Sequence, residues 1–299
     1  MTLHAVNKKK IIAALLELRK NYEGSDRQFA TMWGINQSAW SQLKSGKTDK
    51  LVSDDKLVSI GRKLNVQLMD APDWKIVNTE TFSFVTEQLE VCQREGAARI
   101  LVEMAGIGKT TAAKEFMLKN RNVFYVDCSQ CKGLRLFIKA LAKCMGVSTS
   151  QSFNDMIADI KYCIIGTTKP LIILDEFGDL EYRAFMEVKG LWNATEGCCG
   201  WYAMGADGLK AKIDSGITNK RVGFAEFFRR FGSDYMTVRA KMDVVQERLF
   251  IMAHAEMIVH ANMPGRKVKE LMATSETTGV VYSLTRLKER IIKLKRDAA

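Results

Sequence analysis

A short glycine-rich segment, residues 105–111, has the side chains and spacing that bind phosphate. It follows an apolar stretch typical of a strand and opens a stretch typical of a helix. Glycines let backbone N–H groups surround phosphate oxygens, and the helix N-terminus adds partial positive charge. Lys109 would reach the outer phosphates of a nucleoside triphosphate, and the Thr110 hydroxyl would bind Mg²⁺. The residues that we expect to contact ATP are Ala105, Gly106, Ile107, Gly108, Lys109, Thr110 and Thr111.

One position departs from the usual pattern of such a loop. The pattern places a glycine six residues before the lysine, and this chain has Glu103 there. A larger, anionic side chain at the base of the loop either loosens phosphate binding or points away from the nucleotide. The sequence leaves both alternatives open.

A second segment, residues 170–176, is an apolar run that ends in two acids. Downstream of a phosphate-binding loop, this pattern predicts a buried strand whose end meets the metal and the attacking water. Asp175 would bind Mg²⁺, and Glu176 would polarise the water. Two solvated acids in a turn are the alternative for this segment in isolation. Together the two segments predict ATP binding and hydrolysis.

The elements around these segments predict an α/β fold in which helices sandwich a parallel sheet. Apolar runs typical of strands alternate with helical stretches, after an amphipathic helix at 82–94. The predicted strands are 98–103, 123–127, 171–174 and 201–204. From residue 238 onward the pattern predicts helices only. The predicted divisions are an all-α N-terminal domain at 1–69, a linker at 70–78, a nucleotide-binding domain at 79–237 and a helical lid at 238–299.

The N-terminal region has the pattern of a helix-turn-helix. Apolar residues at helical spacing precede and follow the break at 34–36, so that residues 26–33 and 37–44 form the two helices. The second helix would enter the DNA major groove. An ordinary helical bundle with a solvated polar face is the alternative. The residues that we expect to contact DNA are Gln37, Ser38, Ser41, Lys44 and Lys47.

Composition narrows the class of protein. The chain of 299 residues is 47% hydrophobic and 26% charged, as in a folded globular protein, and its formal charge of +11 favours a polyanionic partner such as DNA. No apolar run approaches the roughly 18 residues of a membrane helix. We therefore expect a cytoplasmic location in a prokaryotic cell or a phage-infected host. Seven widely spaced cysteines indicate reduced thiols, with Cys128 and Cys131 packed after a strand.

Two adjacent carboxylates after a strand, with a helical C-terminal region, resemble the AAA+ ATPases. The resemblance implies an active site between subunits, completed by an arginine from the next subunit that stabilises charge on the transferred phosphoryl group. Residues 227–231 resemble the segment that carries this arginine. Arg230 is the first candidate and Arg229 the second. Surface ion pairs are the other interpretation of both.

The same resemblance implies two sensors of the nucleotide. The family places a polar γ-phosphate sensor after the fourth strand, where this chain has Ala206, so Asp207 is a weak substitute. The segment 279–286 resembles the lid helix whose arginine contacts phosphates, and Arg286 is the candidate. A basic residue facing DNA or solvent is the alternative for Arg286.

A narrower resemblance covers nearly the whole chain. A small helix-turn-helix domain followed by one AAA+ module, with the motifs at 105–114 and 174–176, resembles the MuB-like, TnsC-like and IstB-like transposition ATPases of mobile elements. The resemblance implies an ATP-dependent homo-oligomer or filament on double-stranded DNA that presents the DNA to a transposase and is released after hydrolysis. Lys132 and Arg135 are the candidate DNA contacts inside such a filament, or solvated helix charges.

Two other functions fit the same motifs. One is a helix-turn-helix transcription regulator whose ATPase domain only senses ATP. The other is a replication or helicase-loader ATPase. Salt-sensitive binding with little base preference would favour the transposition regulator, and a single tight operator would favour the transcription factor.

Overall fold

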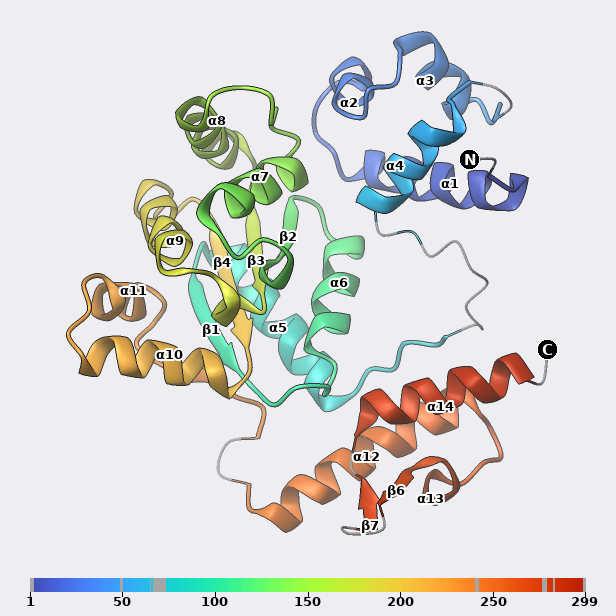
Figure 1. Ribbon diagram of the computed structural model, residues 1–299, viewed down its shortest axis with the longest axis vertical. Helices are drawn as coiled ribbons and strands as arrows, with labels where there is room; N and C mark the ends of the chain where they lie inside the picture. The colour runs from blue at the N-terminus through green and yellow to red at the C-terminus, as the bar shows by residue number, and fades with distance from the viewer. Residues whose placement is uncertain are drawn as a thin grey trace.

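A five-stranded parallel sheet forms the centre of the structure, a computed structural model that describes residues 3–48, 51–64, 66, 74–239, 242–275, 279–281 and 283–297 (Figure 1). The strands are β1 (Ala98–Val102), β2 (Val123–Asp127), β3 (Leu171–Asp175), β4 (Gly200–Gly205) and β5 (Tyr235–Met236). Their order is β2-β3-β4-β1-β5, and every pair is parallel. The four predicted strands are confirmed. The fifth was missed because two residues make no apolar run.

Helices cover both faces of the sheet, so the fold is the predicted α/β sandwich (Figure 1). Successive side chains of a strand point to opposite faces. In β3, Leu171 and Ile173 pack against one layer, whereas Ile172 and Leu174 pack against the other. Burial on both faces explains why the strand is continuously apolar. The first layer is α5 (Glu80–Glu95) and α6 (Lys109–Lys119); the second is α7 (Leu134–Met145), α8 (Phe153–Gly166), α9 (Tyr182–Ala194), α10 (Asp207–Thr218) and α11 (Phe224–Arg230).

Four N-terminal helices pack around a core of their own, which includes Phe29, Trp40 and Leu43. They are α1 (Ala5–Lys20), α2 (Asp26–Met32), α3 (Gln37–Lys44) and α4 (Asp54–Lys63). The side chain of Ser25 caps α2, and that of Asn36 caps α3 by accepting from the backbone N–H of Ala39 over 2.7 Å. Both predicted helices are therefore present at the predicted positions. Their role in DNA binding stays a prediction.

The C-terminal unit contains strands as well as helices, so the prediction of helices only is wrong. Helices α12 (Val244–Asn262), α13 (Val268–Leu271) and α14 (Leu284–Asp297) accompany an antiparallel pair, β6 (Ala273–Ser275) and β7 (Gly279–Val281). Thr274 pairs with Val280 in this hairpin. β-Branched residues lose side-chain freedom in a helix and fit a strand better. Strands of three residues are too short to show an alternating pattern.

The described part of the chain has neither a helix long and apolar enough to span a bilayer nor a group of three or more metal-binding His, Cys, Asp or Glu side chains. All seven cysteines are free. Cys128 and Cys131 are buried after β2, and the Cys131 thiol donates to the backbone oxygen of Asp127 over 3.3 Å.

Candidate nucleotide-binding site

The loop between β1 and α6 has the geometry that the glycine-rich sequence predicts. Gly106 and Gly108 have φ values of +80° and +107°, which side chains with a Cβ rarely adopt. Lys109 begins α6 and is only 5% exposed. Its Nζ donates to the backbone oxygens of Glu103 over 2.7 Å and Met104 over 2.8 Å, so the ammonium lies inside the loop. Burial lowers the pKa of Lys109, and the charges of nearby acids oppose this effect.

The end of β3 lies beside the first turn of α6. The hydroxyl of Thr110 donates to Asp175 Oδ2 over 2.7 Å, and the hydroxyl of Tyr125 in β2 donates to the same oxygen over 2.6 Å. Asp175 is 2% exposed. A hydroxyl and a carboxylate oxygen side by side are ligands that suit Mg²⁺, so these residues fit the metal that the sequence predicts. Tyr125 was not predicted, although a polar tip in an otherwise apolar strand is a signal that was available.

Glu176 follows Asp175 in a left-handed conformation, with φ of +49°. Its side chain is exposed and lines the same cavity as Lys109. The walls of the cavity partly exclude water, and this desolvation is the main cause that raises the pKa of Glu176; the charge of Asp175 adds to it, and that of Lys109 opposes it. Glu176 and Lys109, the predicted phosphate-binding residue, therefore line one cavity.

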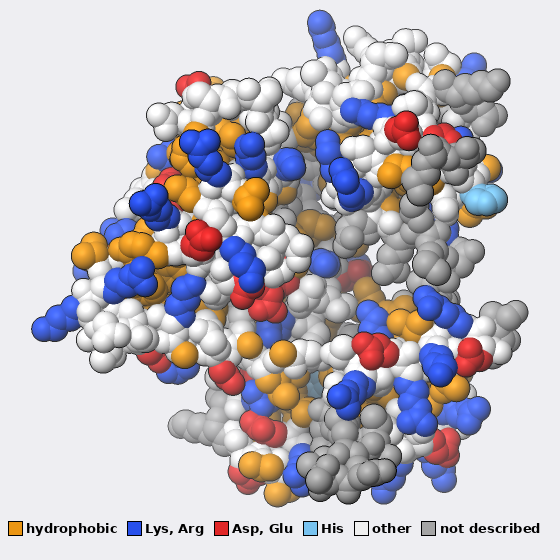
Figure 2. All heavy atoms as spheres, in the orientation of Figure 1, with side chains coloured by type: hydrophobic (Ala, Val, Ile, Leu, Met, Phe, Trp, Pro, Cys, Tyr) orange, Lys and Arg blue, Asp and Glu red, His pale blue; other side chains and the backbone are white. Residues whose placement is uncertain are grey.

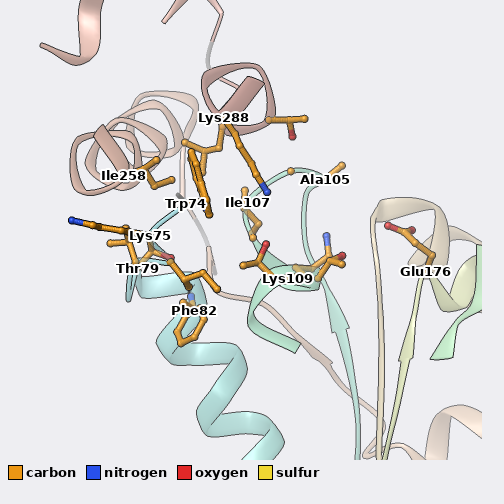
Figure 3. A pocket seen from close by; sticks show the side chains of 18 residues that line it. Trp74, Lys75, Thr79, Phe82, Ala105, Ile107, Lys109, Glu176, Ile258 and Lys288 are labelled. Carbon is orange, nitrogen blue, oxygen red and sulfur yellow. The ribbon is translucent and has the colours of Figure 1, made fainter. Parts of the chain in front are cut away.

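The loop faces a cavity of about 320 Å³ between the sheet domain and the C-terminal helices (Figure 3). Besides the loop and Glu176, its wall includes Trp74, Phe82, Ile258 and Lys288. The Lys288 ammonium lies 5.2 Å from the centre of the Trp74 ring. An apolar wall beside a phosphate-binding loop is suited to a base and its sugar.

Most of this wall was not predicted from the sequence. Trp74 fell in the predicted linker and Lys288 in the predicted helical lid. An aromatic residue in a polar linker was the signal that could have drawn attention to Trp74.

The two predicted sensors do not line the cavity. Asp207 is exposed at the start of α10. Arg286 is exposed on α14, where its backbone N–H donates to Ser283 Oγ, whereas Thr285 and Lys288 of the same helix face the cavity. The contact of Asp207 or Arg286 with nucleotide stays a prediction.

The predicted arginine pair also lies outside the cavity wall. Arg230 bonds to Asn193 Oδ1 through Nε, donates from Nη1 to the backbone oxygen of Glu226 over 3.2 Å and places its guanidinium 5.5 Å from the centre of the Trp192 ring. Arg229 is exposed. Among the described residues, neither arginine forms an ion pair with an acid. A role for either in catalysis therefore requires the site of a second copy.

The predicted DNA-contacting residues fall into two groups. Those on and just after α3 are exposed, and the Lys44 ammonium lies 2.6 Å from Asp26 Oδ2. On the sheet domain, Lys132 pairs with Asp179 over 2.9 Å and Arg135 stacks on Phe153. Lysine and arginine side chains are spread over the whole face shown in Figure 2 rather than gathered in one patch. The exposed residues of α3 are Gln37, Ser38, Ser41 and Lys44, and Lys47 follows them.

Comparison with known proteins agrees with this geometry. The AAA domain family matches residues 99–206. The "ATP-dependent target DNA activator B" of Escherichia phage Mu is 24% identical over 233 residues, which is 75% of this chain and 72% of that protein; the protein of the same name in Escherichia phage D108 gives the same values. The solved structure of the Aeropyrum pernix ORC1 protein in complex with DNA aligns with a TM-score of 0.43 and 16% identity, over 62% of this chain and about half (51%) of that one. This chain therefore contains an AAA domain at residues 99–206 and is similar to the phage target DNA activators over 75% of its length.

Proposed function

We propose that this protein is an ATP-dependent regulator of DNA transposition. It binds Mg²⁺ and ATP, assembles on double-stranded DNA, presents that DNA to a transposase and disassembles after hydrolysis. The observation that carries the proposal is the extent of the similarity to the phage activator. It spans 233 residues, whereas the AAA domain match spans only 99–206, so the likeness includes sequence outside the nucleotide-binding module.

The contacts of the site support hydrolysis as well as binding. Lys109 would reach the outer phosphates, and Thr110 and Asp175, whose oxygens lie 2.7 Å apart, would hold Mg²⁺. Mg²⁺ held there would neutralise charge on the phosphate oxygens. Glu176, which lines the same cavity as Lys109, would orient the attacking water and take its proton. An arginine from a second copy, Arg230 or Arg229, stabilises the charge that develops on the transferred group.

The same arrangement supports assembly and DNA binding. Because the arginine pair lies outside this chain's own cavity, a complete site needs two copies, and ATP would lie between them. The formal charge of +11 gives the assembly a field that attracts DNA phosphates regardless of sequence. The exposed α3 residues add contacts from the N-terminal unit.

Electron microscopy of the purified protein with duplex DNA, with and without ATP, tests this function. Wild type should form helical assemblies on DNA only with ATP. Glu176→Gln should form the same assemblies and keep them, because ATP binds but is not hydrolysed. Lys119→Ala, on the exposed face of α6, is the control and should behave as wild type.

Two outcomes would overturn the proposal. Binding of one operator sequence with no assembly would indicate a transcription regulator. Closed rings that depend on a helicase would indicate a loader.

A further inference from the structure

Glu103 stands where the usual loop pattern has glycine, and its carboxylate is completely buried. Five hydrogen bonds reach it from two parts of the chain. Oε1 accepts from the backbone N–H of Met104 over 2.9 Å and from Arg239 Nε over 2.6 Å. Oε2 accepts from the Thr237 hydroxyl over 2.8 Å and from the backbone N–H groups of Val238 and Arg239 over 2.9 and 3.2 Å. The side chain therefore points away from the phosphate-binding loop.

The donors at 237–239 lie between β5 and the C-terminal helices. Arg239 is 13% exposed and binds two acids at once. Besides its bond to Glu103, its Nη1 donates to Glu247 Oε1 over 2.6 Å, and Glu247 lies in the first turn of α12. One buried carboxylate thus connects the base of the phosphate-binding loop, through one guanidinium, to the helix that contributes Ile258 to the cavity wall.

The charge state of Glu103 matches this role. Burial alone would raise the pKa of Glu103, but the bonds from Met104, Arg239 and Thr237 outweigh burial and hold the pKa below its usual value. The group is therefore an anion at neutral pH. Loss of its partners would leave a buried, uncompensated charge, which is strongly destabilising. We therefore expect the hydrogen bonds to the Glu103 carboxylate to form or break together.

The backbone of Glu103 contacts Lys109, the predicted phosphate-binding residue. Its carbonyl oxygen accepts from Lys109 Nζ over 2.7 Å. The main chain of Glu103 therefore contacts Lys109, and its side chain contacts the segment that leads to the C-terminal helices. A glycine at this position would keep the first contact and lack the second. Glu103, where the usual pattern has glycine, thus connects the loop to residues 237–239.

We propose that Glu103 is a positioning residue that couples nucleotide binding at Lys109 to the placement of α12, through its contacts with residues 237–239. This inference rests on the proposed nucleotide site and adds the route by which the site reaches the lid. When Lys109 turns from the Glu103 carbonyl toward phosphates, residue 103 and the segment bonded to it adjust together. The part of the cavity wall that α12 and α14 form then moves with this segment.

The test compares nucleotide affinity, turnover and lid response in Glu103→Gln and wild type. Glu103→Gln keeps the size of the side chain but removes the charge that holds Arg239. The Kd for Mg²⁺-ATP should rise at least about fivefold, the lower end of typical coupling factors. The kcat at saturating ATP should change much less, because the variant alters binding in the ground and transition states equally.

Hydrogen exchange of residues 244–250 supplies a readout that general destabilisation would not reproduce. In wild type, adding a non-hydrolysable ATP analogue should slow exchange in the first turns of α12. In Glu103→Gln at saturating analogue, that protection should be lost while protection of α6 remains. Arg239→Gln should repeat this result.

Two further variants keep the proposal testable. Thr237→Val removes one uncharged donor to Glu103 and should give a smaller shift in the same direction, even if Glu103→Gln does not fold. Glu256→Gln is the matched control, because Glu256 is an exposed carboxylate of α12 that makes no bond to Arg239 or Glu103 in the described part of the chain, and it should keep the wild-type affinity and α12 protection.

The outcomes separate the inference from the proposed function. Wild-type affinity and α12 protection in both Glu103→Gln and Arg239→Gln would overturn the coupling role and leave the ATPase intact. Failure of wild type itself to bind Mg²⁺-ATP would overturn both.

Discussion

The hydroxyl of Thr110 donates to Asp175 Oδ2 over 2.7 Å and so joins the first turn of α6 to the end of β3. β4 lies between β1 and β3, so the two segments meet across one intervening strand. Tyr125 bonds the same carboxylate oxygen from β2 over 2.6 Å and orients it. Three elements therefore place two candidate metal-binding oxygens at one point, near Lys109, the predicted phosphate-binding residue.

Replacing Thr110 by valine tests the metal site. Thr110→Val keeps the shape of the side chain and removes the hydroxyl. The apparent affinity for Mg²⁺ in the presence of ATP should fall at least about tenfold, since even outer-shell partners of a metal are worth about 10–100-fold. Titration of ATPase activity with Mg²⁺ measures this, and Thr110→Ser, which keeps the hydroxyl, is the control. An unchanged Mg²⁺ dependence in Thr110→Val would remove Thr110 from the metal site.

Removing the ammonium of Lys109 should abolish useful ATP binding. Each hydrogen bond from a charged group contributes about 1.5–3 kcal/mol. Loss of two bonds from the ammonium to phosphate oxygens in Lys109→Ala should therefore raise the Kd for ATP roughly 100-fold or more. Calorimetry measures the Kd, and Lys119→Ala is the control because Lys119 is exposed on the same helix and pairs with Glu115. Thermal unfolding without nucleotide shows whether Lys109→Ala still folds. ATP binding by a folded Lys109→Ala at the wild-type Kd would contradict the site.

The sheet and the loop were predictable because their signals are local. The run from Leu171 to Leu174 is apolar throughout because the strand is buried on both faces, and Gly106 and Gly108 are required by the left-handed turns around the loop. Asp175 ends that strand and Glu176 follows it, so recognising the strand also locates both acids. These features need only a few consecutive residues to be visible.

The remaining features depend on residues far apart in the sequence. The effect of Glu103 could not be decided from the sequence because its partners, residues 237–239, lie more than 130 positions later. The cavity wall joins Trp74 to Lys288 for the same reason. No local pattern of apolar and polar residues records such contacts, and the two residues of β5 are too few to form a pattern.

The position of Arg230 predicts that it acts on the site of another copy. Arg230→Ala should lower kcat in assembled protein by about 10³–10⁵, the usual effect of such an arginine, while the Kd of unassembled protein for ATP stays unchanged. Turnover on duplex DNA and calorimetry without DNA measure the two quantities. Arg229→Ala is the matched variant and should keep most of the activity. The reverse result would assign the role to Arg229.

Mixing two inactive variants tests whether the arginine acts between copies. Glu176→Gln retains Arg230, and Arg230→Ala retains Glu176. A mixed assembly should contain interfaces with both wild-type residues and should recover part of the turnover that each variant lacks alone. No recovery in assemblies that demonstrably contain both chains would place the two residues in the same subunit's site, or Arg230 outside catalysis.

The contact between His254 and α5 predicts that attachment of the lid weakens in mild acid. His254 lies in α12 and is 2% exposed; its Nδ1–H donates to the Phe250 backbone oxygen over 2.8 Å. Its Nε2 accepts from the backbone N–H of Thr81 over 3.2 Å, at the first turn of α5. Burial lowers the pKa of His254, so the neutral ring is the form that the fold stabilises.

The sign of the pH effect follows from this lowered pKa. Because the pKa of His254 is lower in the folded than in the unfolded chain, where it is about 6.5, the stabilisation is fully present above that value and is lost as pH falls through the folded pKa. Protonation adds a hydrogen to Nε2, so that Nε2 can no longer accept from the Thr81 backbone N–H and two donors face each other. Wild type should therefore lose thermal stability between about pH 7.5 and about pH 5.5, and His254→Asn should lose less over that interval. His260→Asn, at an exposed position of the same helix, should retain the wild-type pH dependence, and equal slopes in wild type and His254→Asn would show that His254 does not control the attachment.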